Sequence, residues 1–138
     1  MKNNIIRIGL FGASNILEKV MCEAFIKHPK FSVVGLASKS LNRLDIISKR
    51  LNCKKFNSYE SLIDSQTIDA AYISLPNSMH YDISKKLLNK GIHCLVEKPL
   101  TFLEKQSKEI NHIAKKSKLA LVETFQFQHH SQFKYIKE

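Results

Sequence analysis

The chain has few cysteines and no long hydrophobic run, and each absence excludes a class of protein. Its three cysteines, Cys22, Cys53 and Cys94, lie far apart and form no C-x-x-C pair. Neither a disulfide framework nor a zinc site is therefore expected, and no metal is assigned. No apolar run approaches the ~18 residues of a membrane helix, and the stretch after Met1 lacks the plan of a secretory signal. These features predict a soluble, cytoplasmic protein.

The length and charge narrow the possibilities further. A chain of 138 residues has room for one domain with a substantial core. Its net charge of +10 could serve a nucleic acid, an anionic cofactor or an acidic partner surface. The lysines are scattered over the expected outer faces of helices, and no helix-turn-helix, zinc-finger or RNP-type pattern accompanies them. A solvent-exposed basic surface is the simpler interpretation.

Apolar runs alternate with stretches of helical periodicity along the whole chain. Runs typical of buried parallel strands cover residues 5–11, 31–37, 70–75, 92–96 and 119–122, and a short strand is expected near 55–56. Helices are expected over about 16–25, 41–51, 77–89 and 101–116, with a brief one opening near Ser58. A capping box from Thr101 to Glu104 is expected to start the last long helix. This alternation predicts a doubly wound α/β fold with a parallel sheet.

The turn after the first strand is the first candidate site. It reads Gly12-Ala13-Ser14-Asn15-Ile16 and keeps only the first glycine of the dinucleotide fingerprint G-x-G-x-x-G. Gly12 permits the tight turn, and the free N–H groups at the start of the following helix favour a pyrophosphate. The motif alone does not separate such a site from a purely structural turn between strand and helix.

The residues after the second strand bear on the choice of coenzyme. Sites that prefer NAD place a carboxylate there to bind the ribose 2′-OH. This chain has Ser38 and Lys39 instead, with Arg43 one turn later. Lys39 supplies a positive charge for a 2′-phosphate, and Ser38 supplies a donor. NADP is therefore favoured over NAD, against the alternative of an ordinary polar loop.

Glu97-Lys98-Pro99 follows directly after the apolar run 92–96. In an open parallel sheet the carboxyl ends of the strands border the ligand crevice. A Glu-Lys pair at a strand end is often only a solvent-exposed turn with a weak ion pair. The alternating pattern upstream nevertheless favours a functional lysine at Lys98.

Several motifs resemble those of the Gfo/Idh/MocA oxidoreductases in their order and spacing. They are Gly9-x-x-Gly12, Ser38-Lys39-Ser40, Ser58-Tyr59-Glu60, Leu75-Pro76-Asn77-Ser78-x-His80, Gly91-x-His93-x-x-x-Glu97-Lys98-Pro99 and Glu123. The resemblance spans about Ile5 to Gln132, and the combination of Pro-Asn-x-x-His with Glu-Lys-Pro is highly specific. It implies a three-layer Rossmann fold with strand order 3-2-1-4-5-6.

The resemblance also implies which residues surround the parts of an NADP or NAD molecule. The pyrophosphate would be surrounded by Gly12, Ala13, Ser14, Asn15 and Ile16. The phosphate on the adenosine ribose would be surrounded by Ser38, Lys39 and Arg43. The middle of the coenzyme would lie along Leu75, Pro76, Asn77 and His80. Glu97 would hold the nicotinamide ribose. Lys98 would lie between the nicotinamide and the substrate and polarise the reacting carbonyl or hydroxyl during hydride transfer.

Members of this family usually carry a second, C-terminal α/β domain that binds the sugar. The resemblance therefore implies a coenzyme domain over residues 1–124 and the start of a truncated or absent substrate domain over 125–138. Phe125, Phe127 and Phe133 would face that absent domain. His129-His130 is interpreted as a loop and helix start and not as a metal site.

The expected function is hydride transfer between NADP, or NAD, and the hydroxyl or carbonyl group of a sugar or nucleotide-sugar. The full-length form is expected to be a homo-oligomer. One alternative keeps the fold without the catalysis: a dinucleotide-binding fragment, sensor or partner subunit that lacks the substrate domain. A basic nucleic-acid-binding module is the least favoured alternative. Neither a nucleic acid nor a membrane is expected as a partner.

Overall fold

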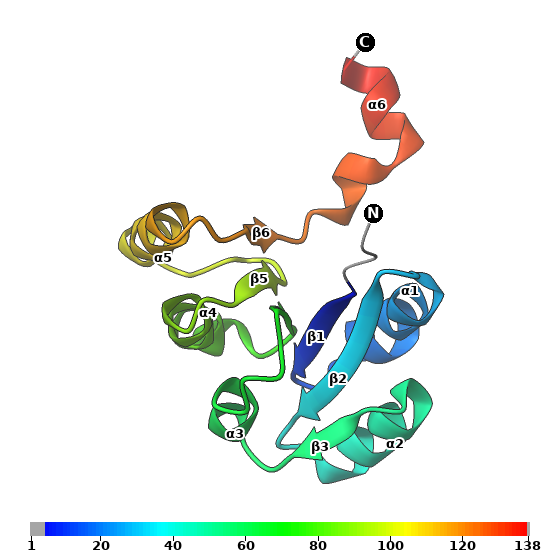
Figure 1. Ribbon diagram of the computed structural model, residues 1–138. Coiled ribbons are helices and arrows are strands. Elements are labelled where there is room, and N and C mark those ends of the chain that lie inside the picture. The colour runs from blue at the N-terminus through cyan, green and yellow to red at the C-terminus, as the bar shows by residue number, and fades with distance from the viewer. Residues whose placement is uncertain (1–4, 138) are drawn as a thin grey trace.

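The computed structural model describes residues 5–137, which are built around a six-stranded sheet (Figure 1). The strands are β1 (Ile6–Phe11), β2 (Phe31–Ala37), β3 (Lys54–Phe56), β4 (Ala70–Ile73), β5 (His93–Val96) and β6 (Leu121–Glu123). They lie in the order β3-β2-β1-β4-β5-β6, and every neighbouring pair is parallel. The predicted Rossmann topology is confirmed. Because the strands all run the same way, their carboxyl ends meet at one edge of the sheet.

Helices cover both faces of the sheet and complete three layers (Figure 1). The helical segments are a π-helical stretch (Leu17–Met21), α1 (Cys22–Lys27), α2 (Leu41–Leu51), α3 (Tyr59–Ile63), a 3-10 turn (Asn77–Met79), α4 (His80–Asn89), α5 (Glu104–Lys116), a second 3-10 turn (Gln126–His129) and α6 (Ser131–Lys137). On one face, α1 and α2 bury a cluster that includes Leu36 and Tyr72. On the other, α3, α4 and α5 bury a cluster that includes Ile73 and Leu87.

The predicted capping box at Thr101 is wrong. α5 begins at Glu104 with Leu103 as its N-cap residue, and no side chain caps it. Thr101 lies two residues before that N-cap, and its hydroxyl instead donates to the Leu103 carbonyl and lies 2.6 Å from Ser107 Oγ. The helix therefore starts later than the Ser/Thr-x-x-Glu pattern suggests.

The helix after the glycine turn contains a π-helical stretch that the periodicity did not predict. The N–H of Cys22 donates to the carbonyl of Leu17, five residues earlier. Such turns are rare and widen the helix locally. Arg50 of α2 donates from Nη1 to the carbonyl oxygen of Glu18 in this stretch, at 2.6 Å. The bond ties the π-helical stretch to α2.

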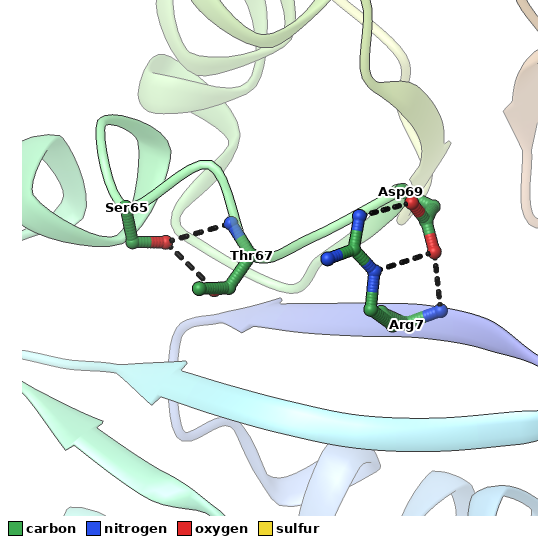
Figure 2. A network of polar contacts seen from close by, with 4 residues as sticks. All are labelled: Arg7, Ser65, Thr67 and Asp69. Atoms are coloured by element: carbon green, nitrogen blue, oxygen red, sulfur yellow. Dashed lines mark hydrogen bonds and ion pairs between the residues drawn. The ribbon is translucent and has the colours of Figure 1, made fainter.

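At the amino-terminal edge of the sheet, Arg7 and Asp69 join the start of β1 to the start of β4 (Figure 2). The Asp69 carboxylate accepts hydrogen bonds from the Arg7 backbone N–H, Nε and Nη2 at 2.8, 3.0 and 2.6 Å. The N–H of Asp69 donates in return to the Arg7 carbonyl at 2.8 Å. These bonds set the register in which Ile8 pairs with Ala70.

After β6 the chain leaves the sheet, and α6 extends away from the three layers (Figure 1). Phe127 packs edge-to-face on Phe125 and Phe133, with ring centroids 5.7 and 5.2 Å apart. Tyr135 and Ile136 of α6 are 82% and 79% exposed. The boundary at residues 124/125 stays a prediction.

Some expectations fall on positions outside the described residues. These are residues 1–4, where no secretory signal is expected, residue 138 at the end of the segment 125–138, and the side chain of His129. None of the helices between residues 5 and 137 combines the length and the hydrophobicity that a membrane-spanning helix needs.

Candidate functional site

A groove of about 500 Å³ lies at the carboxyl edge of the sheet, where β1, β2 and β4 end. Its lining consists of Gly12, Ala13, Ser14, Ser38, Lys39, Ser40, Tyr59, Ser74, Leu75, Pro76 and Met79. Gly12, Ala13 and Ser14 thus meet Ser38, Lys39, Leu75 and Pro76 in one place, although they are far apart in the sequence. Asn15 and Ile16, which were also predicted to surround the pyrophosphate, are not part of this lining.

The glycine turn passes very close to the end of β4. Gly12 has a φ of 95°, in the region that favours glycine, and an added Cβ would lie 2.8 Å from the carbonyl oxygen of Ser74. Ser74 also donates from its hydroxyl to the carbonyl of Gly12 at 3.3 Å. A larger residue at position 12 would therefore separate the two strand ends that form the floor of the groove.

The same turn presents unpaired backbone donors to the groove. Within the part of the chain that the structure describes, the N–H groups of Ala13 and Ser14 donate to no protein acceptor. Ser14 Oγ accepts from the N–H of Leu17 at 3.2 Å and so caps the helix that follows. Free N–H groups at the positive end of a helix dipole attract an anion, and this arrangement fits a pyrophosphate.

The end of β2 adds a second anion-attracting region. Ser38 Oγ accepts from the N–H of Ser40 at 3.1 Å, which leaves its own hydroxyl proton available for a ligand. Lys39 is exposed, and its ammonium makes no hydrogen bond or ion pair with any other described residue. Ser40 is the N-cap residue of α2, but its side chain forms no capping bond and the first turn contains no acidic residue. The region therefore combines a free cation with an uncapped helix terminus.

Arg43, which was predicted to act with Ser38 and Lys39, is not in the groove lining. Its Nη2 lies 2.7 Å from Oε2 of Glu18, and the two side chains are 31% and 35% exposed. The carboxylate that holds Arg43 thus comes from the π-helical stretch after the glycine turn.

The structure separates the four predicted residues that follow β4. Leu75 and Pro76 line the groove, whereas Asn77 is exposed outside the lining and begins the 3-10 turn. The side chain of His80 is fully buried, with Nδ1 2.7 Å from the Pro99 carbonyl oxygen and Nε2 2.9 Å from that of Leu75. A neutral ring can donate to one of these oxygens, and an imidazolium can donate to both. His80 thus links Leu75, which lines the groove, to Pro99 and has no exposed surface for direct contact with a ligand.

The turn after β5 is held by side chains from two neighbouring strands. One carboxylate oxygen of Glu97 accepts from the Tyr72 hydroxyl of β4 at 2.7 Å, and the other accepts from Thr124, just after β6, also at 2.7 Å. The carboxylate of Glu123 accepts from the N–H of Leu100 at 2.7 Å. These bonds fix both ends of the turn.

Lys98 is the free side chain at the centre of this turn. It is exposed, and its ammonium has no hydrogen-bond or ion-pair partner among residues 5–137. The Lys98-Pro99 peptide bond is cis. A cation that projects from a fixed turn can stabilise negative charge on a reacting oxygen without first giving up another partner.

Burial shapes the titration of the groups around this turn. Tyr72 is 1% exposed, and burial, followed by the hydrogen bond to Glu97, raises the pKa of Tyr72 well above its usual value. It therefore stays a neutral donor to Glu97 at any pH near neutrality.

Among the residues that the structure describes, no group of three or more His, Cys, Asp or Glu side chains could hold a metal ion.

Some residues of the site were given no site role from the sequence, although Tyr59 belongs to the motif Ser58-Tyr59-Glu60. Tyr59, Ser74 and Met79 line the groove, and Tyr72 and Thr124 hold Glu97. A usable signal existed for Thr124, because it follows β6 as Glu97 follows β5, and adjacent parallel strands end side by side. Tyr72 gave no such signal, since an aromatic residue in a buried strand is expected to be core.

Known proteins share both the sequence pattern and the fold. A family model described as an oxidoreductase family with an NAD-binding Rossmann fold, Gfo/Idh/MocA, matches residues 6–125. Two curated relatives are dTDP-3,4-didehydro-2,6-dideoxy-α-D-glucose 3-reductases. The one from Streptomyces antibioticus is 32% identical over 127 residues, which are 92% of this chain and 39% of the relative. The one from Streptomyces violaceoruber is 29% identical over 133 residues, which are 96% of this chain and 39% of the relative.

A solved structure gives the same result. KijD10, a 3-ketoreductase from Actinomadura kijaniata crystallised with NADP and TDP-benzene, matches with a TM-score of 0.91 and 30% identity, over 96% of this chain and 41% of that one. The chain thus spans about two fifths of the length of these relatives. From the match over residues 6–125, the sheet order and the strand-end residues together, we conclude that the chain belongs to the Gfo/Idh/MocA oxidoreductases and forms their NAD-binding Rossmann domain.

Proposed function

We propose that the chain binds NADP in the groove at the carboxyl edge, with the pyrophosphate over the glycine turn. The observation that carries this proposal is the convergence of three strand ends on one groove that holds unpaired donors. Ala13 and Ser14 donate from their free N–H groups to the pyrophosphate, and Asn15 and Ile16 extend this contact along the first helical turn. Gly12 keeps the turn low enough for the coenzyme to pass.

The adenosine end favours NADP over NAD. Lys39 and the hydroxyl of Ser38 bind the 2′-phosphate, and Arg43 reaches it from the first turn of α2. No carboxylate lies in the groove lining to accept from a ribose 2′-OH. The crystallisation of KijD10 with NADP supports the same choice.

The nicotinamide end lies at the turn after β5. Leu75 and Pro76 pack against the middle of the coenzyme beside Asn77, and His80 holds their loop against Pro99. Glu97 accepts from the nicotinamide ribose with the lone pairs that Tyr72 and Thr124 leave free.

NADP, when bound, supplies or accepts the hydride. Lys98 donates a hydrogen bond to the reacting oxygen of the substrate and stabilises the charge that develops there. The substrate is a sugar or nucleotide-sugar with a carbonyl or hydroxyl group, as the dTDP-sugar reductases among the relatives suggest. Residues 125–137 begin the substrate domain, and the complete enzyme is a cytoplasmic homo-oligomer.

A second candidate function follows from the share of the relatives that the chain covers, 39%. On its own, the chain binds the dinucleotide without turning over a substrate. Coenzyme binding is common to both functions, so it is the property to test first.

Isothermal titration of the purified chain with NADP and NAD tests the proposal, with Ser14→Asp as the decisive variant. Aspartate at a helix N-cap preserves the cap that Ser14 supplies to Leu17. Its carboxylate would repel the pyrophosphate, so we expect NADP affinity to fall by about tenfold or more. Ser117→Asp introduces the same charge at the exposed end of α5 and should leave the affinity within about twofold.

Two results would contradict the proposal. One is a folded chain that binds neither coenzyme. The other is equal NADP affinity in Ser14→Asp and Ser117→Asp, because the pyrophosphate would then lie away from the glycine turn. Circular dichroism of each variant confirms that the helices are intact.

A further inference from the structure

Glu18 is the point at which two arginines of α2 meet the helix after the glycine turn. Arg50 donates from Nη1 to the main-chain oxygen of Glu18 at 2.6 Å. Arg43 donates from Nη2 to the side-chain Oε2 at 2.7 Å. One arginine thus fixes the backbone of Glu18, and the other is bound by its carboxylate.

We propose that Glu18 is a specificity-determining residue that competes with the 2′-phosphate of NADP for Arg43 and so limits the preference for NADP over NAD. This inference rests on the proposed coenzyme function. The Glu18 carboxylate lies outside the groove lining, but it would change the coenzyme affinity of the site inside the groove.

The position of Arg43 brings it into the reach of a 2′-phosphate. It is the third residue after Ser40, which lines the groove and is the N-cap residue of α2. A cation in the first turn of a helix is opposed by the helix dipole and needs an anionic partner nearby. Glu18 provides that partner when no phosphate is present.

The Arg43–Glu18 ion pair is weak enough for Arg43 to exchange Glu18 for a phosphate. Among the described residues, only one of the five N–H donors of Arg43 has an acceptor, and the two side chains are 31% and 35% exposed. Ion pairs that water can reach are weak. A phosphate with nearly two negative charges and three acceptor oxygens offers Arg43 a stronger, bidentate partner.

Glu18 opposes this exchange because it must give up or share Arg43 when the phosphate binds. NAD has a hydroxyl in place of the phosphate and escapes this competition. Removal of the Glu18 charge should therefore tighten NADP and leave NAD nearly unchanged.

Glu18→Gln tests the inference by isothermal titration of the full chain with each coenzyme. Glutamine keeps the length of the side chain. The hydrogen bond from Arg50 to the main-chain oxygen of residue 18 does not involve the side chain, so the backbone of the π-helical stretch should stay in place. We expect NADP to bind about threefold to fivefold more tightly and NAD affinity to change by less than about 1.5-fold.

Glu23→Gln is the matched control. It makes the same change of charge on the same helix, but Glu23 pairs with Lys27 at 2.7 Å on the exposed face, 58% and 73% exposed. The ratio of NADP to NAD affinity in this variant should equal that of the unmodified chain. The control thereby separates the role of Glu18 from the general effect of losing one negative charge.

A double-mutant cycle with Arg43→Ala completes the test. If Glu18 acts through Arg43, the effect of Glu18→Gln on NADP affinity disappears when Arg43 is absent. An unchanged or lower NADP to NAD ratio in Glu18→Gln, or an effect that persists without Arg43, would overturn this inference alone. An unmodified chain that bound neither coenzyme would overturn the proposed function and this inference with it.

Discussion

The Tyr72 hydroxyl donates a 2.7 Å hydrogen bond to Glu97 and thereby joins the buried face of β4 to the turn that carries Lys98. Tyr72 is a core residue, 1% exposed, whereas Glu97 lies at the rim of the sheet. A buried phenol thus determines the position of a carboxylate next to the proposed functional cation. The packing of the core and the geometry of the site are coupled through this bond.

Tyr72→Phe should destabilise the fold by about 1–2 kcal/mol. Phenylalanine keeps the ring in the core but leaves one Glu97 oxygen without its donor. Urea unfolding followed by circular dichroism measures the loss. Tyr81→Phe is the control, because the Tyr81 hydroxyl also donates to a carboxylate, Glu109 at 2.6 Å, but on the half-buried surface between α4 and α5. The coupling is refuted if the two variants lose the same stability.

Lys39→Ala should weaken NADP binding by about fivefold to tenfold and leave NAD binding within about twofold. The ammonium is free among the described residues and lies in the groove lining, so its loss removes a charge-assisted contact with the 2′-phosphate alone. Titration calorimetry with both coenzymes measures the effect. Lys49→Ala, at the exposed far end of α2, removes an equal charge and should change neither affinity. A parallel loss for NAD would show that Lys39 binds some other part of the coenzyme.

The strand order and much of the groove could be predicted from the sequence because they depend on local patterns. Apolar runs that end at Gly12, Ser38 and Pro76 mark strand ends, and parallel strands bring their carboxyl ends to one edge. The relationship between Glu18 and Arg43 could not be predicted in this way. It links residues 25 positions apart and depends on a π-helical stretch that shifts the helical phase.

His80 and Thr101 show two further limits. The Pro-Asn-x-x-His motif suggested contact with the coenzyme, but packing buries the ring between two carbonyl oxygens. The Thr101 to Glu104 pattern matched a capping box, but the helix begins only at Glu104, and the Thr101 hydroxyl donates to the Leu103 carbonyl instead. In both cases the tertiary environment, which a local pattern does not contain, decides the role of the side chain.

Cys94 should resist alkylation in the folded protein. It is 2% exposed, and burial raises the pKa of its thiol to about 12. At pH 8 roughly one molecule in ten thousand would carry the reactive thiolate, even before access is considered. Peptide mass mapping after iodoacetamide treatment, with and without urea, measures its labelling. Cys53 is an internal comparison, because it is only half-buried and its pKa rises to about 11. Equal labelling of both thiols under native conditions would contradict this account.

The Arg7–Asp69 contact should make the fold sensitive to acid. The side-chain hydrogen bond from Arg7 lowers the pKa of Asp69 below its ordinary value of 3.8. A carboxyl group with a lowered pKa stabilises the fold fully above its unfolded pKa, and this stabilisation is lost as the pH falls through the folded value. Asp69→Asn should therefore lower the Tm at pH 7 by roughly 2–4 °C, a modest effect because the side chains are 48% and 39% exposed.

The difference in Tm between the unmodified chain and Asp69→Asn should narrow as the pH is lowered below about 4, because the unmodified carboxyl then becomes protonated. Thermal unfolding scans from pH 7 to pH 3 measure it. Asp64→Asn is the matched control, since Asp64 makes one exposed ion pair with Lys90 at 2.8 Å and takes no part in strand pairing. It should change the Tm by less than about 1 °C at any pH in this range. A constant difference for Asp69→Asn from pH 7 to pH 3 would mean that the contact stabilises the start of β1 and β4 by shape alone, without the carboxylate charge.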